Sequence, residues 1–205
     1  DQLAQYRPVP RIALLRDRAA NLDCMTRGLW AVHGSDHDLR NQGLVLINNL
    51  QTDIVMAKHL TPATLKKYQV LTITSDPVLS DQLAGTIRDY VQNGGAAYIE
   101  GETINNRIIA ELCGVAVSGA LTNVRVECQT PAPFTFAGAM LPVKARDASV
   151  RAALADGAPL LFERQAGRGK AWYCPAFLSG KAGSQDDLAG YFRKVYDGLA
   201  GPALV

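Results

Sequence analysis

The chain has 205 residues, of which 48% are hydrophobic and 20% are charged, a balance that is typical of a folded domain and excludes a disordered or fibrous protein. Lysine and arginine together number 21 and aspartate and glutamate 19, so the formal net charge is +2. A chain so close to neutrality has no strong field with which to gather nucleic acid or an anionic membrane surface. We therefore expect neither of these partners.

The first residues show no targeting signal. The chain begins Asp1-Gln2-Leu3, without a Met and without a charged and then apolar leader, and we interpret it as an internal piece of a longer protein. No apolar run approaches the roughly 18 to 20 residues that a membrane-spanning helix needs. The sequence predicts no particular compartment.

Strand-like and helix-like segments alternate along the first 115 residues. Ile12–Leu15 is a short apolar run and predicts a strand that is buried on both faces. Further strands are predicted at 53–57, 68–74 and 96–99, and helices at 37–50, 61–67, between Ser80 and Asn93, and at 103–113. Because parallel strands need a crossover connection, this alternation predicts a parallel sheet with helices on both faces.

The remaining residues change to short β-type runs, at 115–117, 124–128 and 134–136. A run at 160–162 is joined to one at 171–173 through Gly167 and Gly169, which predicts an antiparallel hairpin and not a phosphate-binding loop. Ser184 precedes an apolar stripe that predicts a C-terminal helix: Leu188, Phe192, Val195, Tyr196 and Leu199. We expect one domain over residues 1–205, an α/β three-layer sandwich with a mostly parallel central sheet.

Neither the cysteines nor the histidines have the spacing of a metal site. No C-x-x-C is present, so we expect buried free thiols at Cys24, Cys113, Cys128 and Cys174. His33 and His37 would face one cation only within a helix, whereas Gly34 and Ser35 favour a loop that leads into an N-cap. The sequence predicts no metal and no cofactor.

The stretch from Tyr68 to Gly114 carries the clearest family pattern. It reads YQVLTITSDPVLSDQLAGTIRDYVQNGGAAYIEGET, followed by IIAELCGV. This pattern resembles the class I glutamine amidotransferase-like superfamily, which has a flavodoxin-like fold. RIALLRD near the start and DGAPLLFERQAGRGKAWYCPAF near the end fit the first strand and the glycine-turn hairpin of such domains. Within the superfamily, the chain is most similar to the middle, trimerisation domain of family-42 β-galactosidases and related glycoside hydrolases.

The residues that catalyse the reaction in enzymes of this superfamily are missing. Those enzymes need a Cys nucleophile on a sharp turn after a strand, and a His-x-Glu pair after a later strand. Here Glu100–Thr103 form the turn, and Cys174 and Ala176 stand where the base and its orienting acid would be. Cys113 lies near a helix C-terminus, which disfavours a thiolate, and is interpreted as a core residue. We therefore expect no catalytic residue of this kind.

Polar residues at the ends of two predicted strands offer an alternative. Asp76 follows the strand at 68–74, and Glu100, Glu102 and Thr103 follow the strand at 96–99. Open α/β sheets bind ligands at this edge, so these four are candidate ligand-binding residues. Turn chemistry at Asp76 and the start of a helix at the two glutamates are the structural alternatives.

The resemblance implies a non-catalytic structural domain of a β-galactosidase-like glycoside hydrolase. Such a domain packs against the catalytic domain of its own chain and against copies of itself, as a trimer. A small-ligand or hydrolytic site at the acidic strand edge is the first alternative. A sugar-binding module is the second, with Trp30, Trp172, Tyr173 and Phe177 as candidate aromatics. We expect Trp172 in the core, and both interpretations of Trp30 stay open.

Overall fold

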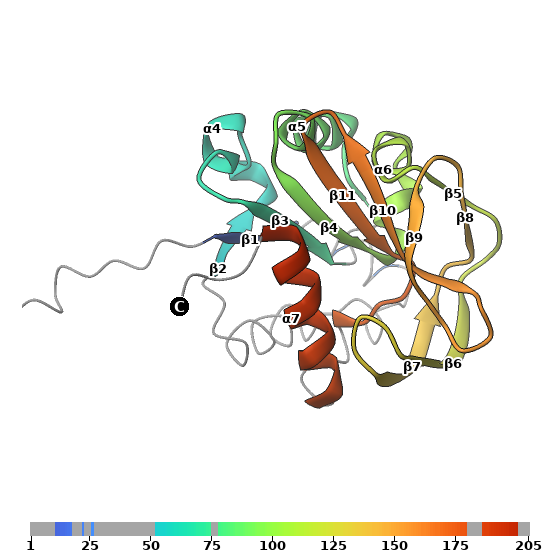
Figure 1. The fold of residues 1–205 in the computed structure, drawn as a ribbon. Coiled ribbons are helices and arrows are strands. Elements are labelled where there is room, and N and C mark those ends of the chain that lie inside the picture. Colours follow the sequence, from blue (N-terminus) through green and yellow to red (C-terminus); the bar gives the residue numbers. More distant parts are fainter. Residues whose placement is uncertain are drawn as a thin grey trace, which may run out of the picture.

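A seven-stranded sheet forms the centre of the molecule (Figure 1). The computed structural model describes residues 11–17, 22, 26, 52–74, 78–179 and 186–200. The strand order is β2-β1-β3-β4-β11-β10-β9. The first five strands of that order are parallel, and β10 and β9 are antiparallel to their neighbours. The strands are β1 Ile12–Arg16, β2 Thr52–Met56, β3 Val70–Thr74, β4 Ala96–Glu100, β9 Ser149–Ala153, β10 Pro159–Ala166 and β11 Gly169–Cys174.

Helices cover both faces of this sheet. The helices α5 (Asp81–Gln92) and α6 (Arg107–Cys113) lie on one face, and α7 (Asp186–Ala200) lies on the other (Figure 1). The described part therefore confirms the predicted flavodoxin-like sandwich with a late hairpin and a C-terminal helix. The shorter elements are η2 Ala57–His59, α4 Pro62–Leu65, η3 Gly101–Asn105, and two small antiparallel sheets, β5 (Val115–Val117) with β8 (Val143–Ala145) and β6 (Thr122–Cys128) with β7 (Phe134–Met140).

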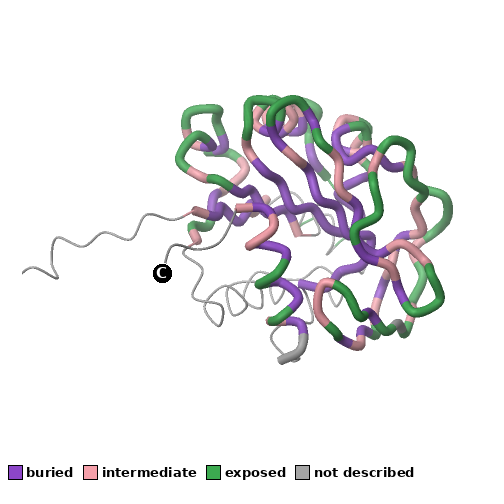
Figure 2. The backbone as a smooth tube through the Cα atoms, viewed as in Figure 1, coloured by how far each residue is buried: buried purple, intermediate pink, exposed green. Residues whose placement is uncertain are grey.

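Alternation along each strand divides the interior into two apolar clusters. In β4, Ala96 and Tyr98 face α7, while Ala97 and Ile99 face α5 and α6. The ring of Tyr98 meets Phe192 of α7 edge to face, with 5.8 Å between the ring centroids. Figure 2 shows the resulting buried band through the central strands. Because side chains alternate between the faces, Glu100 at the end of β4 is directed toward α7.

The predicted signals at the two ends of α5 and along α7 are confirmed where the structure describes them. The Ser80 hydroxyl accepts a hydrogen bond from the Leu83 amide and caps α5. Gly94, with a φ of +110°, follows the end of the same helix. The five apolar residues predicted for α7 are all buried. The predicted helix at 37–50 and the cap at Ser184 lie outside the described residues.

One prediction needs correction, and two strands were not predicted. The helix expected at 103–113 begins at Arg107, because Asn106 is its N-cap and residues 101–105 form the 3-10 helix η3. The strands β8 and β9, which are short and mostly exposed, were not predicted from the sequence. Of the helices that the structure describes, none combines the length and the apolar character needed to cross a membrane.

Candidate functional site

The carboxyl end of β4 holds a fully buried carboxyl group, that of Glu100. The Tyr98 hydroxyl donates a hydrogen bond to its Oε1 atom at 2.7 Å. The backbone amide of Ser179 donates to both carboxyl oxygens at 3.2 Å, and the Ser179 hydroxyl lies 2.5 Å from Oε2. Glu100 thus connects the sheet to the segment between β11 and α7.

Burial controls the proton affinity of this group. Desolvation raises the Glu100 pKa from 4.5 to about 7, although the hydrogen bonds from Ser179 and Tyr98 act in the opposite direction. No cation contributes to the shift among the residues that the structure describes. Near neutral pH, Glu100 is therefore divided between its protonated and ionised forms.

The bend after β4 is made by a glycine. Gly101 has a φ of +58°, a backbone conformation that favours glycine over residues with a side chain. The ring of Phe177 occupies the space that a Cβ atom on residue 101 would need. The Tyr173 hydroxyl donates a hydrogen bond to the Gly101 carbonyl at 3.0 Å. Enzymes of the superfamily need a nucleophile at this bend. Here residue 101 has no side chain, and the Phe177 ring covers it.

The other predicted ligand-binding residues fall into two groups. Thr103 is fully buried in η3, and Glu102 in the same element is only 8% exposed. The structure thus brings Glu100, Glu102 and Thr103 to one turn, but it buries all three, so a ligand would have to displace protein atoms to reach them. Asp76 lies outside the described residues. Glu100 is the N-cap residue of η3 and Glu102 lies in its first turn, as the helix-start alternative expects, although the Glu100 side chain makes no capping hydrogen bond.

The described part of the chain contains no thiolate paired with an imidazole. Cys113, Cys128 and Cys174 are free and buried, and burial raises the pKa of each thiol. His59, in η2, is exposed. Over the same residues, no cluster of three or more His, Cys, Asp or Glu side chains is arranged to hold a metal. Cys24, His33 and His37 lie outside them.

Trp172 is a core residue, as predicted. It is 4% exposed, and its ring packs under α7, where it fills the space beside Gly198. The charged groups of Arg151 and Lys170 lie over the ring, at 5.2 and 5.9 Å from its centroid. A sugar ring cannot stack on a tryptophan that is already covered in this way. Trp30, the other candidate, is outside the described residues.

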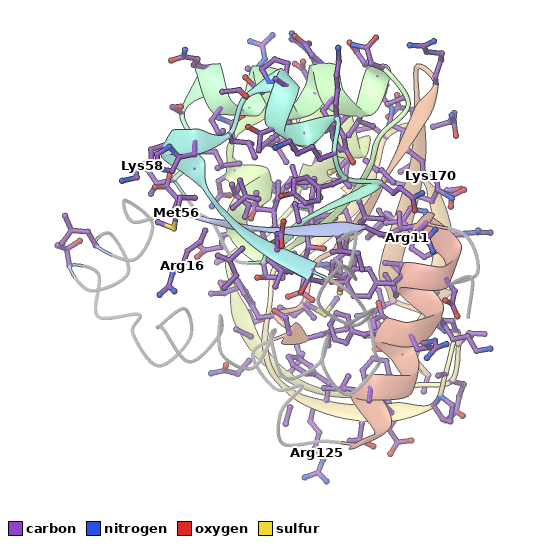
Figure 3. The ribbon with its side chains drawn as sticks, turned by 90° about the vertical axis from the view of Figure 1, so that its left-hand side faces the viewer. Arg11, Arg16, Met56, Lys58, Arg125 and Lys170 are labelled. Atoms are coloured by element: carbon purple, nitrogen blue, oxygen red, sulfur yellow. The ribbon has the colours of Figure 1, made fainter. Side chains whose placement is uncertain are left out.

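A groove of about 1010 Å³ lies at the opposite edge of the sheet, where β3, β4 and β11 begin. Its basic residues are Lys66, Arg168 and Lys170. Arg168 donates to the Asn93 carbonyl at the end of α5, and Lys170 donates to the Gly198 carbonyl near the end of α7. Figure 3 shows Lys170 and Arg11 beside this end of α7. Arg168 and Lys170 therefore donate hydrogen bonds to the C-terminal ends of helices, where the helix dipole favours a positive charge.

The sequence predicted Glu100 as a candidate site residue but did not predict its hydrogen-bond partners, Tyr98 and Ser179. A usable signal was present for Tyr98, because residues two apart in a strand share a face. For Ser179, which is 79 residues from Glu100, no local signal exists.

Comparisons with known proteins agree with this fold. No family model matches the chain, and no curated protein sequence does. Among solved structures, a catalytic mutant of Gan42B, a GH42 β-galactosidase from G. stearothermophilus, matches 97% of this chain with a TM-score of 0.78 and 15% identity. The β-galactosidase from Bacillus circulans sp. alkalophilus also matches 97% of it, with a TM-score of 0.77 and 16% identity.

A protein of different size has a similar fold. A cytoplasmic protein from Salmonella typhimurium LT2 matches 80% of this chain and 87% of its own length, with a TM-score of 0.63 and 16% identity. The two galactosidases, in contrast, are matched over only 31% and 32% of their lengths. The chain therefore spans about a third of those proteins, and it has the flavodoxin-like fold of one portion of a GH42 β-galactosidase, as the sequence pattern predicted.

Proposed function

We propose that this chain is a non-catalytic structural domain of a longer, glycoside-hydrolase-type protein. The observation that carries the proposal is the bend after β4, where Gly101 lies under the ring of Phe177. A glycine supplies no nucleophile, and the ring leaves no room for a substrate above it. The acidic residue before the bend, Glu100, is used for internal hydrogen bonds to Ser179 and Tyr98.

The partners in this proposal are the catalytic domain of the same chain and further copies of the protein. The fold similarity to about a third of GH42 β-galactosidases supports a domain that works inside a larger enzyme. By the same similarity we propose a trimer. A specific contact in such an assembly would bury about 800 Å² on each partner.

Two measurements on the full-length parent protein test the proposal. Sedimentation should give the mass of a trimer, and Glu102→Ala should leave kcat and KM for a β-galactoside unchanged, because Glu102 is buried in η3. A matched exposed variant, Glu127→Ala on β6, controls for a general loss of folded protein. A monomer at high concentration would refute the assembly, and a large fall in kcat confined to Glu102→Ala would support a catalytic role for the acidic edge instead.

A further inference from the structure

The segment Pro175–Ser179 follows β11 and leads toward α7. Hydrogen bonds hold it at both of its ends. Near its start, the Leu141 amide donates to the Pro175 carbonyl at 3.0 Å, and the Phe177 amide donates to the Ala139 carbonyl at 3.3 Å. At its far end, the amide and hydroxyl of Ser179 both lie on the Glu100 carboxyl group. The Glu100 side chain, at the end of β4, therefore holds the Ser179 end of this segment.

Among the residues that the structure describes, the surroundings of Glu100 offer hydrogen bonds but no opposite charge. Tyr98 comes from the same strand, Ser179 from the segment, and Cys174 from the end of β11. The described groups that contact Glu100 or interact with it electrostatically are neutral near pH 7: Tyr98, Tyr173, Cys174, Ser179, Tyr191 and Tyr196. Glu102, the next carboxyl group along the chain, is not among the groups that shift the Glu100 pKa.

The two protonation states of Glu100 differ in cost. A protonated carboxyl group can donate its hydrogen to the Ser179 hydroxyl while it accepts from Tyr98 and from the Ser179 amide, and no charge is buried. An ionised carboxylate accepts from all three donors, but no cation among the described residues offsets its buried charge, so burial disfavours this form. Since desolvation is the larger of the two effects on its pKa, ionisation favours any state in which water reaches the carboxylate.

We propose that Glu100 is a protonation-dependent clamp on the Pro175–Ser179 segment: the neutral carboxyl group favours the segment closed on the end of β4, and ionisation of Glu100 shifts the equilibrium toward a state in which the segment is open to solvent. The proton that Glu100 loses passes to the buffer, and water replaces Ser179 as the donor to the carboxylate. The opening exposes Cys174, which is fully buried in the closed state and directly precedes the segment.

Thiol labelling on the full chain tests the clamp. A neutral alkylating reagent is applied between pH 6 and 8, and peptide mass spectrometry gives the labelling rate of Cys174 relative to that of a small model-peptide thiol in the same solution. Cys113, buried in the other apolar cluster on the α5 and α6 face, reports opening of the whole fold and should label much more slowly than Cys174. With Glu100 titrating near 7 when closed and near 4.5 when open, the ratio should rise about tenfold over this range.

The variants decide whether Glu100 is responsible. In Glu100→Gln the ratio should stay constant across the range, while Glu127→Gln, which changes an exposed carboxylate on β6, should behave as the parent does. Tyr98→Phe removes a hydrogen bond that favours the ionised form, so it should move the midpoint of the rise to higher pH. A flat ratio in the parent, the same rise in Glu100→Gln, or an unmoved midpoint in Tyr98→Phe would each overturn the proposal. The Tyr98→Phe result decides it if Glu100→Gln does not fold.

Discussion

The ring of Phe177 packs directly on Gly101, at the place where any larger residue 101 would put its Cβ atom. Gly101 also has a φ of +58°, which residues with a side chain rarely adopt. Two independent constraints, one steric and one conformational, therefore select glycine at the bend after β4. The same bend would have to hold the nucleophile of an amidotransferase-like enzyme, so packing and catalysis are in conflict at this position.

Gly101→Ala should destabilise the fold by about 2 to 4 kcal/mol, the sum of a left-handed conformation and an overpacked contact. Urea unfolding measures the change. Gly157→Ala is the matched control, because Gly157 also has a positive φ, +87°, but has open space where its Cβ atom would be. It should cost only the conformational part, about 1 kcal/mol. Equal losses in the two variants would show that Phe177 does not restrict the bend.

The Glu100 pKa predicts how global stability depends on pH. The folded-state pKa of about 7 lies above the ordinary value of 4.5, so the folded protein keeps this proton longer than the unfolded chain. The stabilisation from Glu100 is therefore complete below pH 4.5, and it is lost as the pH rises through 7. The loss from this group reaches about 3 kcal/mol at higher pH.

Urea unfolding at pH 5 and pH 8 checks this prediction. Glu100→Gln cannot ionise, so its stability should fall less between the two pH values than that of the parent. The difference between the two proteins removes the contribution of every other titrating group. Parallel losses in parent and variant would mean that Glu100 titrates normally in the folded protein.

Local signals in the sequence predicted most of the described fold. The short run of β4, the Ser80 cap and the apolar stripe of α7 all depend on residues that are near each other in the chain. In contrast, β9 has an exposure pattern without regular alternation, and its place at the sheet edge depends on pairing with β10. Such pairing is a property of the folded chain and leaves little trace in the strand itself.

The candidate site was predictable only in part. The position of Glu100 at the carboxyl end of a buried strand followed from the strand pattern. Its burial did not, because that depends on Ser179 and on the packing of α7, which come much later in the chain. The start of α6 was misplaced for a related reason: the bend at Gly101 leads into a tight 3-10 turn, and this turn delays the helix until Asn106.

Asn106 should contribute more than an ordinary N-cap. Its Oδ1 atom accepts from the amides of Ile108 and Ile109, and its Nδ2 atom donates to the Leu79 carbonyl and to Asp81. Asn106→Ala should therefore cost about 2 kcal/mol, at the upper end of the range for caps. Asn106→Asp keeps the cap but places a second carboxylate beside Asp81. Thermal unfolding should rank the aspartate variant between the parent and the alanine variant, and an aspartate variant as stable as the parent would show that Nδ2 contributes nothing.

The end of α7 provides a prediction about charge. Lys170 donates to the Gly198 carbonyl, and Arg11 donates to the Ala200 carbonyl at 2.7 Å, so one cation on β11 and one directly before β1 satisfy groups that the helix leaves unpaired. Lys170→Met keeps most of the side chain over Trp172 and removes only the charge and the donor. It should lower stability by about 1 kcal/mol, the usual value of a cation at a helix C-terminus. Lys194→Met, at an exposed position within α7, should change stability by less than about 0.5 kcal/mol. Urea unfolding of both variants at low and high salt separates the contributions, because salt should reduce the Lys170 effect if it is electrostatic and leave it unchanged if it comes from packing on Trp172.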